Sequence, residues 1–283
     1  MKVLVTGGAG FVGTNLISRL LKENHQVYSL DNYLIGKVEN HVNGATYING
    51  DVLLINDLIK EKFDLCFHLA GLSRIQPSFE NPFETFEVNT KGTLAILEWA
   101  RKNSVKVVYS GSSSKHHNPF ISPYATFKYL GEEICKLYRE TFNIKVEIVR
   151  FYNVYGPYEI IDGDWAAVIG KWRGQIHRKE PITIVGDGEQ KRDFTHVEDI
   201  VDGLIKIANS SISNPDGWEL GTGQNYSINE VYDFFNLRFK NIEKIYIPDQ
   251  KGNYRETLRE DNKALKILGW EPKDKLEEYI LQL

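Results

Sequence analysis

Tyr124 and Lys128 are the two residues whose types and spacing most directly suggest proton-transfer chemistry. They stand four residues apart in a segment with helical spacing, so both side chains lie on one face of a predicted helix. A phenol with a pKa of about 10 is a weak base at neutral pH. A nearby ammonium group and a further positive charge favour the phenolate, which could accept a proton from a substrate hydroxyl. Without further context, the same spacing also describes an ordinary surface pair.

A glycine-rich segment near the N-terminus could bind a dinucleotide. Gly7, Gly10 and Gly13 follow a predicted strand at 3–6 and open a predicted helix at 11–23. This order allows a tight turn, close approach of the backbone to a pyrophosphate, and phosphate binding by helix N-terminal N–H groups. Asp31 ends the next predicted strand, where a carboxylate accepts from the adenosine ribose and repels a 2′-phosphate. The combination favours NAD over NADP, although Asp31 alone could be a turn or helix-cap residue.

The elements that would position these groups alternate between strands and helices. Apolar runs and helical spacing predict strands at 3–6, 26–30, 45–49, 64–69, 105–110 and 145–150, and helices at 11–23, 90–102 and 122–142. This alternation indicates an α/β fold, a Rossmann-like doubly wound parallel sheet with helices on both faces. Ligands are then expected at the carboxyl ends of the strands.

After Arg150 the pattern changes to shorter, mixed elements. These are predicted helices at 166–178, 197–208, 228–239 and 263–268, and predicted strands at 182–185 and 244–247. We expect an NAD-binding Rossmann domain at 1–155, with segments near 194–223 returning to it. A smaller C-terminal α/β domain, at 156–193 and 224–283, is expected to bind the substrate.

Composition narrows the class of protein. The chain carries 34 Lys and Arg against 38 Asp and Glu, a net charge of −4, whereas nucleic-acid binding favours a basic face. No apolar run reaches the roughly 18 residues of a membrane span, so no membrane contact is expected. Two cysteines, Cys66 and Cys135, are too few for a disulfide framework or a Cys-based zinc site, and both suit a core. We expect a cytoplasmic protein that binds no metal and no nucleic acid.

Several further motifs occur in a fixed order along the chain. They are Gly7-x-x-Gly10-x-x-Gly13, Asp51-Val52, His68-Leu69-Ala70-Gly71, Val88 to Thr93, Ser110-Gly111-Ser112, Tyr124-x-x-x-Lys128, Arg150 to Pro157, Gly186-Asp187-Gly188, Arg192 to Val197 and Leu268-Gly269-Trp270. Together they cover nearly the whole chain. The set resembles the extended short-chain dehydrogenase/reductase superfamily, and within it the nucleotide-sugar epimerases and dehydratases, most closely the UDP-glucose 4-epimerase-like enzymes. The resemblance implies NAD, a nucleotide-sugar substrate of the UDP-hexose type, and a homodimer formed through helices near 90–102 and 122–142.

The resemblance also implies roles for individual residues. Tyr124 would accept the proton, Lys128 would hold the nicotinamide ribose, and Ser112 would hydrogen-bond the reacting hydroxyl, with Ser113 or Ser114 as alternatives to Ser112. Cofactor contacts are implied for Gly7, Gly10, Phe11, Val12, Gly13, Asp31, Asn32, Asp51, Val52, Leu69, Ala70, Gly71, Asn89, Ser110, Tyr124, Lys128 and Tyr152. Asn89 could instead have a structural role beside the cofactor.

Substrate contacts are implied for Ser112, Tyr124, Asn153 and Arg192, and a guanidinium suits a diphosphate. The family usually has a second arginine near the position of Gln250. In this chain Arg255 or Lys251 could replace it.

The chain departs from the family after Ser112. Lys115-His116-His117 stands where relatives carry Tyr-Gly, and the segment 113–123 is shorter than usual. The two histidines could contact the sugar or act as acid and base, or they could simply be exposed loop residues. This departure bears on the identity of the sugar more than on the type of reaction.

We predict an NAD-dependent nucleotide-sugar 4-epimerase. In this reaction hydride leaves C4 of the sugar, the transient 4-keto sugar turns over, and hydride returns to its opposite face. The related 4,6-dehydratases carry Asp-Glu after the serine, and here Ser113 and Ser114 occupy those places. The alternatives are a nucleotide-sugar 4,6-dehydratase, decarboxylase or 4-keto reductase and, from another class, a non-catalytic NAD-binding sensor or scaffold.

Overall fold

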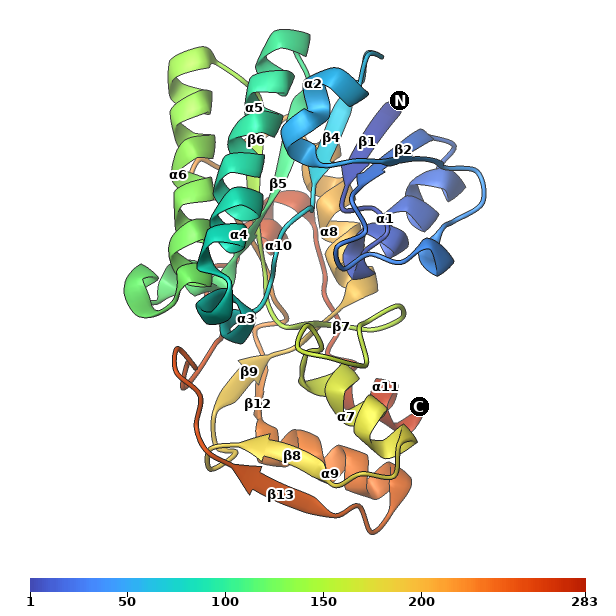
Figure 1. Ribbon diagram of the computed structural model, residues 1–283, viewed down its shortest axis with the longest axis vertical. Coiled ribbons are helices and arrows are strands. Elements are labelled where there is room, and N and C mark those ends of the chain that lie inside the picture. The colour runs from blue at the N-terminus through green and yellow to red at the C-terminus, as the bar shows by residue number, and fades with distance from the viewer.

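The computed structural model describes residues 1–283 and centres on a seven-stranded sheet (Figure 1). In the order in which they pair, the strands are β11 (Trp218–Leu220), β6 (Val146–Phe151), β5 (Lys106–Ser112), β4 (Leu65–His68), β1 (Lys2–Thr6), β2 (Gln26–Asp31) and β3 (Thr46–Asn49). Every neighbouring pair is parallel. The predicted Rossmann-like α/β fold is therefore confirmed.

The direction of strand addition reverses between β1 and β4. The chain adds β2 and β3 on one side of β1 and then adds β4, β5, β6 and β11 on the other. In a sheet of this kind the connections diverge at the reversal and leave a crevice outside the carboxyl ends of the two strands. The Gly7 turn follows β1 and the Leu69 turn follows β4, so both open onto this crevice.

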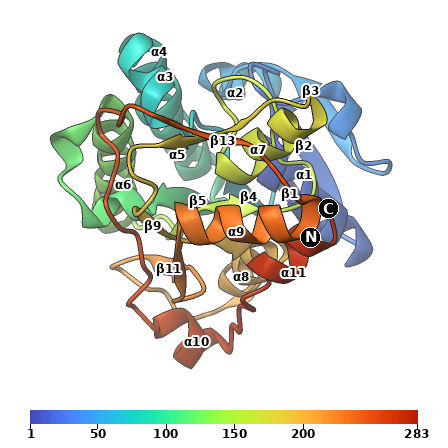
Figure 2. The same ribbon diagram turned by 90° about the horizontal axis from the view of Figure 1, so that it is seen from below.

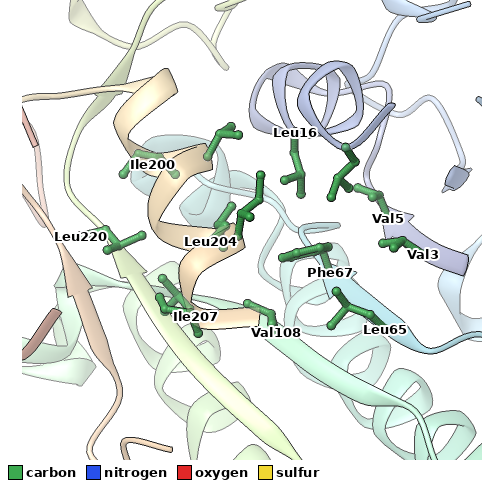
Figure 3. Close-up of a cluster of buried hydrophobic side chains, with 14 of the residues drawn as sticks. Val3, Val5, Leu16, Leu65, Phe67, Val108, Ile200, Leu204, Ile207 and Leu220 are labelled. Atoms are coloured by element: carbon green, nitrogen blue, oxygen red, sulfur yellow. The ribbon is translucent and has the colours of Figure 1, made fainter. Parts of the chain in front are cut away.

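Side chains along each strand point alternately to the two faces of the sheet. Both faces carry apolar side chains, so helices cover both. Val3 and Val5 pack against α1 (Phe11–Lys22) and α8 (Val197–Asn209). Leu4, between them, packs on the opposite face, which is covered by α2 (Ile55–Leu58), α5 (Gly92–Asn103) and α6 (Pro123–Phe142). Figure 3 shows side chains of α1 and α8 gathered over strand residues such as Phe67. Burial of each such side chain contributes about 1.5–3 kcal/mol, so this core holds the strand ends in place.

Helix α6 has strong local signals at both ends. The Ser122 hydroxyl accepts a hydrogen bond from the Ala125 N–H over 3.1 Å, and Pro123 occupies the first helical position. The helix ends at Asn143, which adopts the left-handed conformation. Tyr124 lies in the first turn and Lys128 one turn later, so the cap fixes the position of both side chains.

A second group of elements lies beyond the carboxyl ends of the sheet, in the lower half of Figure 1. It contains α7 (Val168–His177), α9 (Ile228–Phe239), α11 (Leu276–Leu281), the parallel pair β8 (Ile182–Val185) and β13 (Lys244–Ile247), and the antiparallel pair β9 (Lys191–Asp193) and β12 (Asn225–Ser227). These elements share a core that includes Trp172 and Phe235. Seen from below, α9 crosses in front of the sheet with α11 beside it (Figure 2).

The chain passes between the two groups more than once. The pair β7 (Val154–Tyr155) and β10 (Thr195–His196) joins them, and α8 and β11 then belong to the sheet. Helix α10 (Lys263–Leu268) also packs on the sheet side, beside β11. The exact domain boundaries stay a prediction.

The structure also contains elements that the sequence patterns did not indicate. Two short helices, α3 (Ile75–Glu80) and α4 (Pro82–Phe86), precede a π-helical turn at Glu87–Lys91, so α5 begins at Gly92 and not near 90. Pro77 and Pro82 interrupt the apolar periodicity here, which hid both helices. Strand β11 and helix α11 are too short to give a periodic signal. None of the helices is long and apolar enough to cross a bilayer.

Candidate active site

A cavity of about 620 Å³ occupies the crevice between the sheet and the second group of elements. Most of the residues that the sequence nominated line it, namely Gly7, Gly10, Phe11, Val12, Gly13, Asp31, Asn32, Asp51, Val52, Leu69, Ala70, Gly71, Ser110, Ser112, Tyr124, Lys128, Asn153 and Arg192. Asn89, Tyr152 and Arg255 lie outside its wall. Tertiary structure therefore brings together residues from strand ends, loops and helices that lie far apart in the sequence.

The turn between β1 and α1 contains Gly7, Gly10 and Gly13, which have no side chains to keep a ligand away from the backbone. We call this turn the glycine cradle. Gly7 has a positive φ of 71°, and a Cβ at Gly13 would lie 2.2 Å from the carbonyl oxygen of Gly7. Helix α1 begins at Phe11, and no side chain caps its first N–H groups. These free donors and the positive end of the helix dipole face the cavity and fit the pyrophosphate of a dinucleotide.

Two carboxylates stand where the adenosine end of a dinucleotide would lie. The Asp31 carboxylate accepts hydrogen bonds from the Ala9 and Tyr33 N–H groups, each over 2.9 Å. Asp51 accepts from the Leu53 N–H over 2.8 Å and from the Asn32 amide over 3.1 Å. These bonds hold both side chains in a fixed orientation, as recognition of a ribose and a base requires.

Tyr124 and Ser112 meet in the wall of the cavity. The Tyr124 hydroxyl donates to Ser112 Oγ over 3.0 Å, and the Ser114 N–H donates to the same oxygen over 3.2 Å. No hydrogen bond joins Tyr124 to the side chain of Ser113 or Ser114. Lys128 Nζ, one helical turn from Tyr124, donates to the Ser110 carbonyl oxygen over 2.7 Å. The three nominated catalytic side chains therefore lie at one place in the cavity wall.

Burial shapes the protonation of this group. Burial raises the pKa of Tyr124, while the Ser112 hydroxyl and the Arg74 guanidinium oppose the rise. Burial lowers the pKa of Lys128 to about 8, against the opposing effect of Glu132. In the protein by itself the phenol is therefore protonated at neutral pH. A further positive charge beside it, such as a nicotinamide ring, would lower the pKa of Tyr124 and favour the phenolate.

Arg192 and Asn153 also line the cavity. Burial lowers the pKa of Arg192 to about 10, and its Nη2 donates to Asn253 Oδ1 over 2.6 Å. The Asn153 amide donates to Asp193 O and Thr257 Oγ1, each over 3.0 Å, so it also ties three segments together. Arg192 is thus a cation with little water around it, as a diphosphate site needs.

Three nominated residues occupy other positions. The Asn89 amide accepts from the Leu72 N–H over 2.8 Å and donates to the Leu72 carbonyl over 2.9 Å, which holds the loop after β4 in place. Tyr152 is buried and donates to Glu219 Oε2 over 2.9 Å. Arg255 is exposed and pairs with Asp187 over 2.8 Å. Asn89 therefore supports the cavity wall through Leu72, whereas Tyr152 and Arg255 have their partners outside the wall.

The two histidines of the shortened segment lie outside the cavity wall. His116 Nε2 lies 3.0 Å from Glu219 Oε1, and Arg150 Nη1 donates to the same oxygen over 2.6 Å. His117 stacks on Tyr254, with ring centroids 4.0 Å apart, and Tyr254 does line the cavity. His117 therefore does not line the cavity itself but packs behind Tyr254, which does.

Arg74, Glu159 and Tyr254 line the cavity although the sequence analysis did not single them out. Arg74 Nε donates to the Trp165 carbonyl over 2.8 Å. Burial raises the pKa of Glu159 to about 6, and burial raises the pKa of Tyr254 to about 12. A signal existed for Arg74, since it is a charged residue just after the matched segment His68–Gly71. Glu159 and Tyr254 stand in irregular segments without such a marker.

Comparison with known proteins gives consistent matches over most of the chain. Residues 3–221 match the model of the NAD dependent epimerase/dehydratase family. A putative UDP-glucose 4-epimerase of Methanocaldococcus jannaschii is 33% identical, over 98% of this chain and 95% of that protein.

Two solved structures extend the comparison. UDP-glucose 4-epimerase of Thermotoga maritima, solved with UDP-glucose, has a TM-score of 0.91 at 30% identity, over 99% of this chain and 96% of that one. UDP-glucuronic acid 4-epimerase of Bacillus cereus, solved with UDP-glucuronic acid and NAD, has a TM-score of 0.88 at 26% identity, again over 99% and 96%. The likeness therefore includes both the sheet and the second group of elements.

Proposed function

We propose a function from the premise that this chain belongs to the NAD dependent epimerase/dehydratase family. As a member it is an NAD-dependent enzyme that acts on a nucleotide sugar. Within the family we propose a 4-epimerase of UDP-hexoses that acts through a transient 4-keto sugar. The relatives that support this assignment are named as epimerases of UDP-glucose and of UDP-glucuronic acid.

The hydrogen bond between Tyr124 and Ser112 is the observation that carries the proposal. It lies in the wall of the same cavity as the glycine cradle, so a dinucleotide and a sugar could meet beside it. The Ser112 oxygen already accepts from Tyr124 and from the Ser114 N–H, which leaves its own proton free to donate to a sugar oxygen. A binding protein has no need of such an arrangement.

Each side chain then has a distinct task. NAD supplies, when bound in the cradle, a reversible acceptor for the hydride of sugar C4. Ser112 holds the C4 oxygen, and Tyr124 accepts its proton in the first half-reaction and returns it in the second. Lys128 provides positive charge close to Tyr124 and a donor for a ribose hydroxyl. Arg192, on β9, holds the diphosphate while the keto sugar turns over.

Of the alternatives, the 4,6-dehydratase needs chemistry that the wall beside Ser112 does not offer. Elimination of water requires an added acid and base next to the reacting carbon. Ser113 and Ser114 line the cavity there, and neither side chain titrates near neutral pH. The side chains beside Ser112 therefore support the simplest reaction, which is oxidation and reduction at one carbon of the sugar. A 4-keto reductase needs no added acid and base, so the product assay below distinguishes it.

A product assay tests this proposal. Purified protein is incubated with UDP-glucose, UDP-galactose, their N-acetyl forms and their uronic acids without added cofactor, and products are read by proton NMR. We expect a C4 epimer without net NADH, and a loss of about 10²–10⁴-fold in kcat for Tyr124→Phe. Tyr246→Phe, at an exposed tyrosine outside the cavity, is the matched control. A keto or decarboxylated product, or consumption of added NADH, would assign one of the alternatives, and normal turnover by Tyr124→Phe would refute the mechanism.

We also propose that the chain forms a homodimer in the cytoplasm. Leu94 of α5 and Leu130 and Leu137 of α6 are exposed on the helices through which the resemblance implies dimerisation. Light scattering on the purified protein tests the oligomeric state.

A further inference from the structure

Arg74 presents an unpaired guanidinium to the cavity. It stands directly before α3, and its Nε donates to the Trp165 carbonyl over 2.8 Å. No other hydrogen bond and no ion pair of this side chain occurs within the protein, so Nη1 and Nη2 have no partner. Because Arg74 lines the cavity, these two nitrogens are available to a ligand.

The guanidinium lies at the reacting end of the cavity. Its charge opposes the effect of burial on the pKa of Tyr124, and Tyr124 in turn opposes the lowering of the pKa of Arg74 by burial. Arg192, which suits the diphosphate, belongs to β9 in the other group of elements. Arg74 also directly precedes α3, where the Ser78 hydroxyl accepts a hydrogen bond from the Tyr124 N–H over 3.1 Å, so Arg74 lies near the reacting group.

Among the acidic residues of the wall, the charge of Glu159 acts on Arg74 and opposes the lowering of its pKa by burial, but no ion pair joins the two side chains. Glu159 is buried, and its Oε1 is bound to Arg173 Nη1 over 2.7 Å. Its Oε2 is buried without a partner, and burial raises the pKa of Glu159 to about 6. Glu80 and Asp164 also line the cavity but form no ion pair with Arg74. Arg74 therefore keeps two terminal nitrogens without a partner beside the cavity, and an anion would satisfy both of them in a charge-assisted pair.

We propose that Arg74 is a specificity-determining residue that binds a carboxylate on the sugar, so that the substrate is a nucleotide uronic acid. This inference rests on the proposed function for the nucleotide and the orientation of the sugar. A carboxylate matches the two terminal nitrogens of a guanidinium in a bidentate, charge-assisted pair, whereas a neutral hydroxymethyl group offers a single uncharged oxygen. The Nε–Trp165 bond holds the fork in place, which reduces the entropy lost on binding.

Binding of a matched ligand pair tests the inference independently of turnover. UDP-glucuronic acid and UDP-glucose differ only at C6, and their Kd values are measured calorimetrically on NAD-loaded Tyr124→Phe protein, which does not turn them over. We expect the uronic acid to bind about 10–100-fold tighter, because a charge-assisted pair contributes that much. In Arg74→Gln this preference should fall to about unity, and Arg74→Lys should keep part of it.

Arg178→Gln is the matched control. Arg178 also contacts the segment after Glu159, through Asp162, but it lies outside the cavity wall. If Arg74 only anchors the segment that contains Trp165, both variants should weaken the two ligands equally and leave their ratio unchanged. That result would overturn the inference, as would equal binding of the two sugars by the wild type or no binding of either.

The outcomes separate the two proposals. Preference for the uronic acid that depends on Arg74, with no epimer in the product assay, supports the inference and refutes the 4-epimerase. Epimerisation of UDP-glucose with no Arg74-dependent preference supports the epimerase and refutes the inference.

Discussion

The phenol of Tyr124 donates a hydrogen bond to the hydroxyl of Ser112 over 3.0 Å, although the two residues belong to different elements. Ser112 ends β5, and Tyr124 lies in the first turn of α6. The Ser122 cap and the pairing of β5 with β6 hold the two side chains in this position. The geometry of the proposed proton transfer therefore depends on the N-cap of α6 and on the end of β5.

Replacement of Ser112 should reduce the rate of the chemical step. Ser112→Ala removes the group that holds the sugar oxygen, so we expect kcat to fall about 10–100-fold, the equivalent of one charge-assisted hydrogen bond. Ser112→Thr retains the hydroxyl and should recover part of the rate. Steady-state kinetics measure both variants, and NAD binding checks that they are folded. A large loss in Ser113→Ala with a normal Ser112→Ala would move the role to the neighbouring serine.

Replacement of Asp31 should change the choice of cofactor. Asp31→Asn removes a negative charge and disturbs one of the two bonds to the Ala9 and Tyr33 N–H groups. We expect the affinity for NAD to fall about 10–100-fold and the relative affinity for NADP to rise. Fluorescence titration of both dinucleotides measures the ratio, with Asp57→Asn at an exposed site of α2 as the control. An unchanged ratio would show that this carboxylate does not face the ribose.

The contact between His116 and Glu219 should make stability depend on pH. The hydrogen bond that His116 donates to the Glu219 carboxylate raises the pKa of His116 above its ordinary value in the folded protein. Folding therefore favours the protonated ring, and the stabilisation is complete below a pH of about 6.5 and disappears as the pH rises through the folded pKa.

We expect His116→Asn to lower the free energy of unfolding by about 0.5 kcal/mol near pH 5.5, and by less near pH 8.5, because the side chain is half exposed. Urea unfolding at both pH values measures the difference, and His177→Asn at an exposed site controls for other effects. A cost that is the same at both pH values would contradict the ion pair.

Removal of Arg150 should strongly destabilise the fold. Its guanidinium is buried between Glu132 and Glu219, at 2.8 and 2.6 Å. Arg150→Met leaves two buried carboxylates without their cation, at a cost of about 3–5 kcal/mol. Arg19→Met breaks an exposed pair with Glu23 and should cost less than about 1 kcal/mol. Chemical unfolding compares the two, and equal small losses would show that the buried cluster relaxes or takes up water.

The long elements could be predicted because their apolar patterns are strong. β1 contains a continuous apolar run buried on both faces, α1 repeats apolar residues at helical spacing, and the glycines between them allow a tight turn. Helix α6 carries a serine cap, a proline at its first position and a long apolar stripe, so its bounds agreed within a residue. Helices α3 and α4 did not follow from pattern, because six and five residues that include a proline hold too little periodicity, and strand β11 has only three residues.

The same division applies to the site. Local order along the chain was enough to nominate Tyr124, Lys128 and the glycine turn, because their spacing within one helix or one turn determines their geometry. Arg74, Glu159 and Tyr254 come from segments far apart in the sequence, and only packing of the second group of elements against the sheet brings them to one cavity.

His116 and His117 lie outside the cavity wall for a reason that is equally non-local. His116 meets the buried Glu219, and His117 meets the ring of Tyr254. Charge pairing and stacking with residues more than a hundred positions away leave no trace in local spacing.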